Sequence, residues 1–506
     1  MRLINRTIEK GLNNRYRKLL VGVENPFSSQ KKISDNLLKN LRKTIYFKKV
    51  SGNEVNNLTQ FLSNIPLNDY NSLKPFIEDA LKGTKNVLWP GYVKWFAKSS
   101  GTTEDKSKFI PVSKATLKEC HYKAGRDLLA LFVKNNPDTN IFYGNGLIMG
   151  GSTQINRMNA FSVTGDLSAI LSENLPLWTK LWQMPGKKTM STTNWEDKIN
   201  KIAEETIKSN ITNITGVPTW TIVLFNKILS LSGKNNIHEV WPNLELYIHG
   251  GVSFEPYRHL FAQYLPDSKM KYMETYNASE GFFGIQDLPG QNDLLLLVNH
   301  GIFYEFIPFD ENFSLQSKTI QLEDVETGKN YAIVISTNSG LWRYVIGDTI
   351  TFTSVKPYRF VITGRTKHFI NAFGEELIID NADKAISFAC KETNSIVKDY
   401  TAAPVFFDNH KSGAHEWLIE FEQQPENTEF FIDCIDTKLK ELNSDYEAKR
   451  SHNLALSKPI LHVLPENTFY QWLKANHKLG GQNKVPRLSN NRNTVESILN
   501  FLDKNV

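Results

Sequence analysis

The stretch that most constrains this chain is the run KSSGTTEDKSKFIPVS at residues 98–113. It places four hydroxyl side chains around one glycine, at Ser99, Ser100, Gly101, Thr102 and Thr103. Glycine lets the backbone bend tightly, and the N–H and O–H donors of such a loop can wrap an anion, with Lys108 adding positive charge. In isolation this composition is typical of a polar surface turn. The apolar runs VKWFA before it and FIPV after it favour instead a loop that projects from a folded core.

Length and composition predict a protein of several domains. At 506 residues, 40% of them hydrophobic, the chain exceeds one typical core. Its 59 basic and 53 acidic residues are interspersed, whereas nucleic-acid-binding proteins usually concentrate their basic residues. The three cysteines form no CxxC pair, the N-terminus lacks an apolar signal region, and no apolar run reaches the roughly 18 residues of a membrane span. We therefore expect a cytoplasmic protein without nucleic-acid or membrane partners, of an oligomeric state that the sequence leaves open.

The N-terminal half alternates helical and strand-like patterns. Residues 1–90 are mainly helical in pattern, and Ser113 is a candidate N-cap for the helix after the hydroxyl-rich loop. The segment IFYGNGLIMGGS at 141–152 indicates a buried strand that runs into a glycine turn. Residues 194–232 are again helical in pattern, interrupted by TGVPTW. The glycines at 144–151 do not have the G-x-G-x-x-G spacing of a dinucleotide site.

The second half changes from mixed to β patterning. The segment WPNLELYIHGGVSFEPYRHLF at 241–261 predicts a strand, a Gly-Gly turn and a helix. Ligands of α/β sheets bind beyond the strand C-termini, so His249 and Gly251 are candidates for a pocket wall, with a purely structural histidine as an equal alternative. Short segments rich in β-branched and aromatic residues follow as far as Thr363, and a smaller mixed unit begins after Gly364.

A carboxylate motif, YNASEGFFG, occupies residues 276–284. Glu280 follows a strand-like run and is flanked by small residues. Near a triphosphate, a carboxylate oxygen is what Mg²⁺ prefers, although a lone glutamate can equally cap a helix or form an ion pair. Tyr276 can stack on a purine, although a buried core tyrosine is the ordinary alternative.

Three further motifs follow along the chain. GLWRYVIGDT at 340–349 places Asp348 after a glycine between two β-like runs, where it can accept hydrogen bonds from ribose hydroxyls or simply form a hairpin turn. Arg365 lies at the change of pattern and can pair with phosphate or form an interdomain ion pair. Lys484 lies in GGQNKVPRL at 480–488, on a candidate mobile loop. The ordinary alternative is a solvated surface charge, as for most lysines.

The order of these motifs resembles the Gretchen Hagen family of acyl acid amido synthetases, in a bacterial-type form, within the adenylate-forming superfamily of acyl-CoA synthetases and luciferases. The resemblance spans nearly the whole chain. It implies an α/β fold with a large N-terminal adenylation domain over residues 1–364, built of β-sheets packed with helices plus a β-barrel-like part. A small mobile α+β domain over residues 365–506 is implied to close over the active site.

The resemblance also implies roles for individual residues. The loop Ser99–Thr103 and Lys108 would contact the phosphates of ATP, and Glu280 would hold Mg²⁺. Asp348 would hold the ribose and Arg365 would lie at the hinge. The residues bordering the adenine would be Tyr276, Asn277, Ala278 and Ser279, and candidates for the acyl pocket are Thr153, His249, Gly251 and Phe282. Lys484 would approach the acyl-adenylate centre.

Two departures from the family pattern concern local contacts. Glu104-Asp105 stands where the superfamily has glycine in its phosphate loop, and Val345 stands where plant members carry an arginine.

The implied reaction joins a small carboxylic acid to an amine or amino acid through acyl-AMP. An acyl-CoA ligase shares the first step and is the nearest alternative. A non-catalytic nucleotide- or metabolite-binding regulator is the other, although such a protein would not need Lys484. The chain has no GxSxG or HExxH nucleophile or metalloprotease motif.

Overall fold

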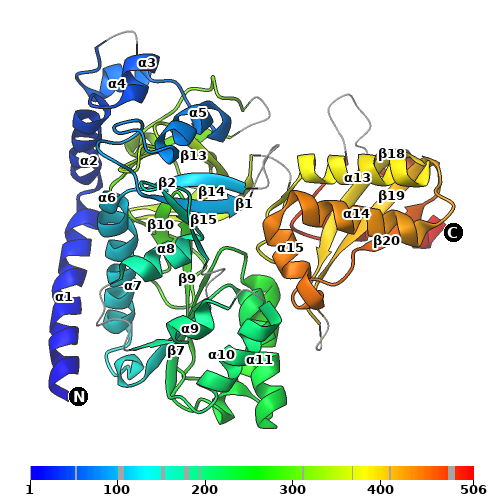
Figure 1. Ribbon diagram of the computed structural model, residues 1–506, viewed down its shortest axis with the longest axis horizontal. Helices are drawn as coiled ribbons and strands as arrows, with labels where there is room; N and C mark the ends of the chain where they lie inside the picture. The colour runs from blue at the N-terminus through cyan, green and yellow to red at the C-terminus, as the bar shows by residue number, and fades with distance from the viewer. Residues whose placement is uncertain are drawn as a thin grey trace.

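The computed structural model describes residues 2–51, 54–100, 107–149, 154–175, 182–192, 195–309, 313–366, 369–408, 412–476 and 485–505. Figure 1 shows a large lobe that contains the N-terminus and a smaller lobe that contains the C-terminus. The last strand of the large sheet ends at Arg365. The domain boundary after Gly364 remains a prediction at this position.

An 11-stranded sheet forms the centre of the large lobe, in the order β12-β13-β14-β15-β11-β10-β9-β8-β7-β3-β6. One half is parallel and consists of β3 (Asn145–Met149), β6 (Gln183–Met184), β7 (Ile211–Gly216), β8 (Leu246–Gly250) and β9 (Lys271–Ala278). The other half is antiparallel and consists of β10 (Gly281–Ile285), β11 (Leu294–Leu296), β12 (Ile302–Pro308), β13 (Asn330–Thr337), β14 (Tyr344–Val355) and β15 (Tyr358–Arg365). The antiparallel half is joined to the parallel half through β9, and the two halves form one continuous sheet.

A second, four-stranded sheet carries the hydroxyl-rich loop. Its order is β2-β1-β5-β4, with β1 (Trp95–Ser100), β2 (Ser107–Val112), β4 (Ile155–Arg157) and β5 (Val163–Gly165). Phe96 and Ile110 in the two strands that flank the loop are fully buried. The expectation that the loop projects from the core is therefore confirmed for the strands at its base.

Helices cover this lobe, and α1 and α7 run side by side along one edge in Figure 1. The helices are α1 (Arg2–Glu24), α2 (Pro26–Leu41), α3 (Ile45–Val50), α4 (Leu58–Asn64), α5 (Tyr70–Leu81), α6 (Lys114–Thr116), α7 (Tyr122–Asn135), α8 (Leu167–Asn174), α9 (Lys187–Met190), α10 (Trp195–Thr206), α11 (Pro218–Ser232) and α12 (Arg258–Tyr264). A π-helical turn, η1 (Leu117–His121), separates α6 from α7. Ser113 is the predicted N-cap: its hydroxyl accepts a hydrogen bond from the Thr116 N–H at 3.0 Å.

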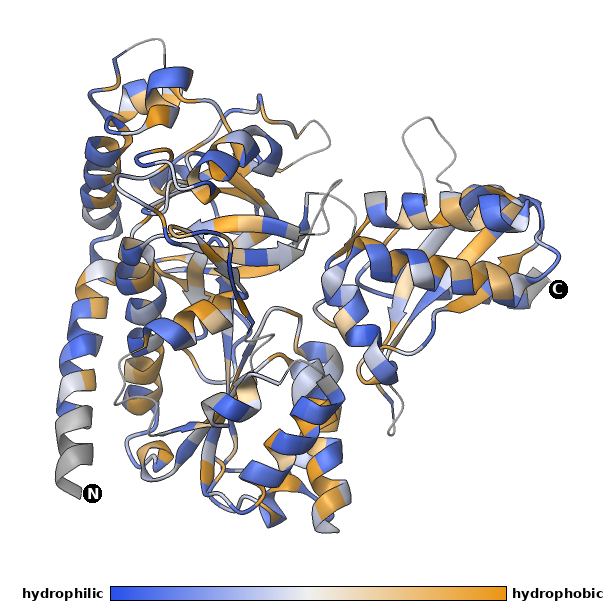
Figure 2. Ribbon diagram, viewed as in Figure 1, coloured by the Kyte–Doolittle hydropathy of each residue, from blue (hydrophilic) through white to orange (hydrophobic). Residues whose placement is uncertain are grey.

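The small lobe packs helices against a three-stranded sheet, β18-β19-β20. Its elements are β16 (Phe369–Ile370), β17 (Leu377–Ile378), α13 (Ile379–Thr393), β18 (Ile396–Val405), β19 (Ala414–Gln423), α14 (Thr428–Leu442), α15 (Ser444–Arg450), β20 (Ile460–Leu464), α16 (Thr468–Ala475) and α17 (Asn493–Asn505). Figure 2 shows hydrophilic and hydrophobic residues interleaved along α13 and α14, as expected of helices with one buried face.

One prediction about the large lobe was partly wrong. The helices predicted on either side of TGVPTW are present as α10 and α11, but the interruption begins earlier and contains a strand, β7, in the middle of the parallel half. Its sequence, ITNITG, is short and half polar, and helical patterns flank it on both sides. Ile211 and Ile214 are nevertheless fully buried, so packing between β3 and β8 decides the conformation.

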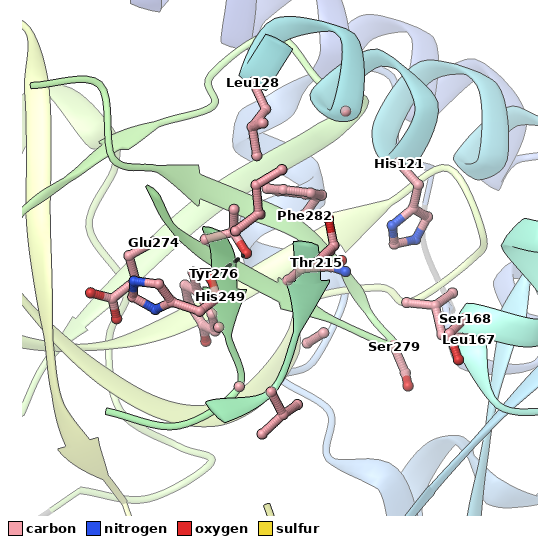
Figure 3. Close-up of a pocket in the computed structure, with 18 of the residues that line it drawn as sticks. His121, Leu128, Leu167, Ser168, Thr215, His249, Glu274, Tyr276, Ser279 and Phe282 are labelled. Atoms are coloured by element: carbon pink, nitrogen blue, oxygen red, sulfur yellow. Dashed lines mark hydrogen bonds between the residues drawn. The ribbon is translucent and has the colours of Figure 1, made fainter. Parts of the chain in front are cut away.

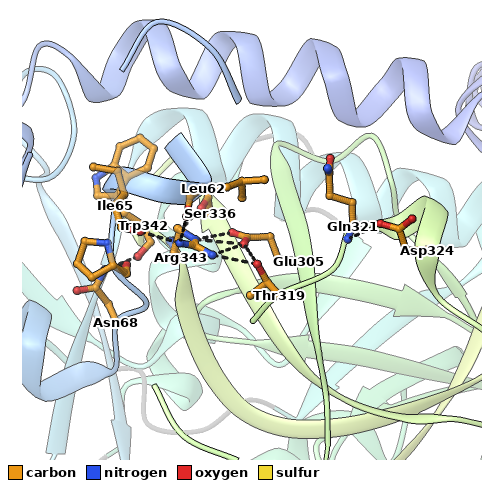
Figure 4. Close-up of polar contacts among 11 residues, drawn as sticks. Leu62, Ile65, Asn68, Glu305, Thr319, Gln321, Asp324, Ser336, Trp342 and Arg343 are labelled. Atoms are coloured by element: carbon orange, nitrogen blue, oxygen red, sulfur yellow. Dashed lines mark hydrogen bonds and ion pairs between the residues drawn. The ribbon is translucent and has the colours of Figure 1, made fainter. Parts of the chain in front are cut away.

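A buried ion pair links the antiparallel half of the sheet to the N-terminal helices (Figure 4). The side chains of Arg343 and Glu305 are 8% and 1% exposed, and Arg343 Nη2 lies 2.7 Å from Glu305 Oε2. Arg343 Nη1 also donates to the carbonyls of Leu62 and Ile65, at 2.6 and 2.7 Å. Thr319 completes the network by donating to Glu305 at 2.7 Å. Every charged group of the pair thus has hydrogen-bond partners, which a buried charge requires.

Replacing Arg343 with methionine should lower the free energy of unfolding by roughly 3–5 kcal/mol, because Glu305 would keep a buried and unpaired charge. Chemical denaturation followed by near-ultraviolet circular dichroism measures this loss. Lys329→Met removes one partner of the exposed Lys329–Glu326 pair and is the matched control, with little or no expected loss of stability because solvent screens an exposed pair. Equal effects of the two substitutions would contradict the importance of the buried network.

Candidate active site

The parallel strands end at one large cavity, of about 2490 Å³. The last residues of β3, β7, β8 and β9 all line it: Met149, Gly216, Gly250 and Ala278. In open α/β sheets this edge is where ligands bind, because loops after the strands converge there. The cavity is therefore the candidate active site.

The hairpin between β9 and β10 brings the YNASEG motif to this cavity. Ser279 and Glu280 form the turn that joins the two strands. The Tyr276 ring is 7% exposed, packs against Phe283 with the ring centroids 4.8 Å apart, and still lines the cavity. Tyr276 is thus both a core residue and a wall of the candidate site.

Asp348 joins Tyr276 to Arg365. It accepts a hydrogen bond from the Tyr276 hydroxyl, and its Oδ1 lies 2.5 Å from Arg365 Nε. Burial raises the pKa of Tyr276 well above its usual range, and the Asp348 charge adds to that rise. Arg365 Nη2 also lies 3.7 Å from Glu376 of the small lobe. Residues from three separate sequence motifs therefore meet in one charged cluster.

The Gly347-Asp348 step is not the hairpin turn that the sequence permitted. Both residues lie inside β14, where Gly347 has a φ of +98° and the pairing with β15 contains register shifts. A positive φ costs glycine little, so the strand can deform here without ending. Across the ladder, Asp348 is the direct partner of Arg365, which explains why the two side chains pair.

Glu280 and Lys108 form a second charged group at the cavity wall. Burial raises the pKa of Glu280 to about 7, and the charge of Lys108 acts in the opposite direction. Lys108 Nζ also lies 5.6 Å from the centre of the Tyr70 ring. Ser99 faces Lys108 across the β1–β2 ladder and lines the same cavity. Among the described residues no group of three or more acidic, cysteine or histidine side chains is arranged to hold a metal ion.

Three candidate acyl residues, His249, Gly251 and Phe282, also lie on the cavity wall, and Figure 3 shows His249 and Phe282 close to Tyr276. His249 is 4% exposed, its ring stacks on Phe254 with the ring centroids 4.1 Å apart, and burial lowers its pKa to about 3. Gly251 has a φ of +82°, and its carbonyl accepts a hydrogen bond from Asn371 of the small lobe at 3.1 Å. Phe282 lines the cavity from β10. The structure thus places all three on the wall of the candidate site.

Several predicted site residues lie outside the described part of the chain: Gly101, Thr102, Thr103, Thr153 and Lys484. Ser100 is described only as the last residue of β1. Asn277, Ala278 and Ser279 line the cavity.

Two cavity residues were missed by the sequence reasoning, His121 and Glu274. Burial raises the pKa of Glu274 to about 7, with Arg258 opposing and Glu255 adding to the rise. Neither residue belongs to a recognisable motif, and only the helix and strand periodicity around them gave any signal.

Within the described chain, no helix has the length and apolar character needed to cross a membrane.

Three family models match this chain in order. They are the GH3 family N-terminal domain over residues 15–270, the GH3 family central domain over 295–365 and the GH3 family C-terminal domain over 380–493. Indole-3-acetic acid-amido synthetase GH3.3 of Arabidopsis thaliana is 24% identical over 547 residues, which cover 90% of this chain and 88% of the relative. Jasmonoyl-L-amino acid synthetase JAR4 of Nicotiana attenuata is 26% identical over 310 residues, which cover 57% of this chain and 52% of the relative.

Solved structures with similar folds agree with these matches. A GH3.15 acyl acid amido synthetase superimposes with a TM-score of 0.61 at 16% identity, covering 96% of this chain and 95% of the other. A 2-hydroxyisobutyryl-CoA ligase superimposes with a TM-score of 0.56 at 11% identity, covering 95% and 92%. The predicted α/β fold class is therefore confirmed.

Replacing Glu274 with glutamine should stabilise the protein above neutral pH. Between the usual glutamate pKa near 4.5 and the folded value of about 7, the unfolded chain has lost a proton that the folded chain keeps, so folding becomes less favourable as pH rises. At about pH 8 the variant should be more stable by on the order of 1–2 kcal/mol, and the difference should shrink as the pH falls and vanish only below the usual glutamate pKa near 4.5. Thermal melting across this range measures it. Glu204→Gln, at an exposed position on α10, is the control and should show no such trend.

Proposed function

Since this chain belongs to the GH3 family, we propose that it is an ATP-dependent acyl acid amido synthetase. It would activate a carboxylic acid as acyl-AMP with release of pyrophosphate, and then transfer the acyl group to the amine of an amino acid. The observation that carries this proposal is the meeting of Tyr276, Asp348 and Arg365 in the cavity that Glu280 and Lys108 also line. These residues come from motifs far apart in the sequence.

The charged end of the cavity is the part of its wall where Lys108, Glu280, Asp348 and Arg365 lie. It suits a magnesium–nucleotide complex. Tyr276 and the residues 277–279 would border the adenine, and Asp348 would accept hydrogen bonds from the ribose. Lys108 and Ser99, with the loop residues 101–103, would contact the phosphates. Glu280 would hold Mg²⁺ together with phosphate oxygens, since burial leaves its carboxyl poorly stabilised as an anion in the free protein. When bound, the metal would neutralise negative charge on the phosphates.

A carboxylate is a poor electrophile, which explains why the reaction needs two steps. In the first, the acid's carboxylate oxygen bonds to the α-phosphorus of ATP and the bond to pyrophosphate breaks. Lys484 would lie between the two approaching anions and offset their repulsion. In the second, the amine nitrogen bonds to the acyl carbon, AMP leaves, and the amine loses its proton. Arg365 and Glu376, which pair across the two lobes, would be positioned to respond to movement of the small lobe.

The acid would lie against His249, Gly251, Phe282 and Thr153. The names of the two relatives differ in the acid, so family membership alone does not identify it. We also place the enzyme in the cytoplasm, because its cysteines, Cys120, Cys390 and Cys434, are all free thiols.

The function is tested by following AMP and pyrophosphate release from Mg·ATP across a panel of carboxylic acids, with and without an amino-acid mixture. Acid-dependent pyrophosphate release, with AMP turnover raised by amino acids, is the expected result. Stimulation by coenzyme A in place of amino acids would show an acyl-CoA ligase. ATP binding without turnover on any acid would favour a nucleotide-binding regulator.

Replacing Asp348 with alanine should weaken ATP binding by about 10-fold or more, because it removes the proposed ribose acceptor and leaves Arg365 without its closest carboxylate. Isothermal titration with a non-hydrolysable ATP analogue measures the dissociation constant. Asp267→Ala, on an exposed loop, is the control. An unchanged affinity in Asp348→Ala would contradict the ribose assignment.

Replacing Lys484 with alanine should reduce acid-dependent pyrophosphate exchange by at least about 100-fold while ATP affinity changes little, because the lysine is proposed to act on the reacting groups. Lys474→Ala, at an exposed position on α16, should leave the exchange rate unchanged. Undiminished exchange in the Lys484 variant would overturn its proposed role.

A further inference from the structure

A buried histidine with unused hydrogen-bonding capacity faces the cavity beside the hairpin that joins β9 to β10. His121 is the last residue of the π-helical turn η1, is 4% exposed, and points toward the cavity in Figure 3. Burial lowers its pKa to about 4, so the ring is neutral at physiological pH. The Asn277 side chain lies near the ring and raises the pKa of His121, but it does not reach hydrogen-bond geometry with either ring nitrogen. Neither ring nitrogen completes a hydrogen bond with any residue that the structure describes.

The position of His121 is fixed by packing against the hairpin that carries Glu280. Cys120, the preceding residue, is fully buried and its sulfur accepts a hydrogen bond from the Phe282 N–H at 3.2 Å. Leu117, at the other end of the π turn, is also buried. The imidazole is therefore held rigidly beside β10 and does not lie on a mobile surface segment. A rigid, buried and unsatisfied polar group is costly unless a ligand or water pairs with it.

The surroundings of His121 are apolar or neutral. Leu128, Leu167 and Phe282, with the small hydroxyl side chains of Ser168 and Thr215, line the same cavity as His121 (Figure 3). Pockets for small molecules usually combine such an apolar lining with a few polar groups that fix orientation.

The cationic side chains described around the cavity are either engaged by a carboxylate or exposed to solvent. Lys108 acts on Glu280, Arg258 on Glu274, and Arg365 pairs with Asp348. Arg15 is paired with the buried Asp127, while Lys18 and Arg126 line the cavity with solvent-exposed side chains. None of these cations is itself buried, so the described cavity wall provides no buried positive charge for a second negative group beside His121.

We propose that His121 is a specificity-determining residue, which selects an acid whose non-reacting part is largely apolar and carries one uncharged hydrogen-bonding group, such as a hydroxyl. This inference rests on the proposed function, because it assigns the part of the cavity around His121 to the acyl group. A neutral imidazole offers one N–H donor and one nitrogen acceptor, which matches a hydroxyl that both donates and accepts. A second carboxylate would be desolvated there without a cation.

The test compares matched acids by the kcat/KM of acid-dependent pyrophosphate exchange. One series is phenylacetic acid, its ring-hydroxylated analogues and the analogue with a ring carboxylate; the other is octanoic acid, its terminal hydroxy analogue and the corresponding dicarboxylic acid. The wild-type enzyme should prefer a hydroxylated acid over its parent by about 10-fold or more, and should discriminate against both dicarboxylic acids.

Substitution then connects the preference to the imidazole. In His121→Leu the ratio of kcat/KM for the hydroxylated acid to that for its parent should fall to about 3-fold or less. His121→Gln, which retains a donor and an acceptor, should restore part of this ratio. Thermal melting shows whether each variant is folded. A wild-type enzyme that prefers the parent or the dicarboxylic acid overturns the inference, whatever the variants do, and so does an unchanged preference in folded His121→Leu. If no acid in any panel supports exchange, the proposed function itself fails.

Discussion

The buried pair between Arg343 and Glu305 is the interaction on which the candidate site depends most. Arg343 adopts a φ of +43°, which a side chain of its size rarely adopts, and the network of Figure 4 holds it there. The following residues form the start of β14, which carries Asp348 to the cavity. A charge pair in the interior thus fixes the start of a strand whose later residues line the site. The cost of desolvating the pair is offset by hydrogen bonds to Thr319 and to the carbonyls of Leu62 and Ile65.

The site lies where two kinds of sheet meet. Strand β9 pairs in parallel with β8 and in antiparallel fashion with β10, so it belongs to both halves. The parallel half supplies the open edge at which ligands of α/β proteins bind. The antiparallel half supplies tight hairpins and cross-strand pairs, which place Glu280 in a turn and Asp348 opposite Arg365. Neither half alone would bring these carboxylates to the end of a parallel sheet.

The sequence predicted the residues of the charged end better than their partners. Tyr276, Glu280, Asp348 and Arg365 belong to short motifs, and all line the cavity. The pairing of Asp348 with Arg365 was not predictable, because it depends on a strand register that shifts near Gly347. Strand β7 was missed because its conformation is decided by its neighbours in the sheet. His121 was missed for a similar reason, since only tertiary packing shows that it faces the cavity.

The π-helical turn before α7 has a consequence for how such an enzyme can change over evolutionary time. A π turn contains about one residue more than an α-helical turn, and losing that residue restores the ordinary helix. Each α-helical residue rotates the following side chains by about 100°. A single deletion within 117–121 would therefore swing the imidazole away from the cavity without altering Glu280, Asp348 or Lys108 in sequence. The choice of acid could then diverge between relatives by a change in length, while the machinery at the charged end stays the same.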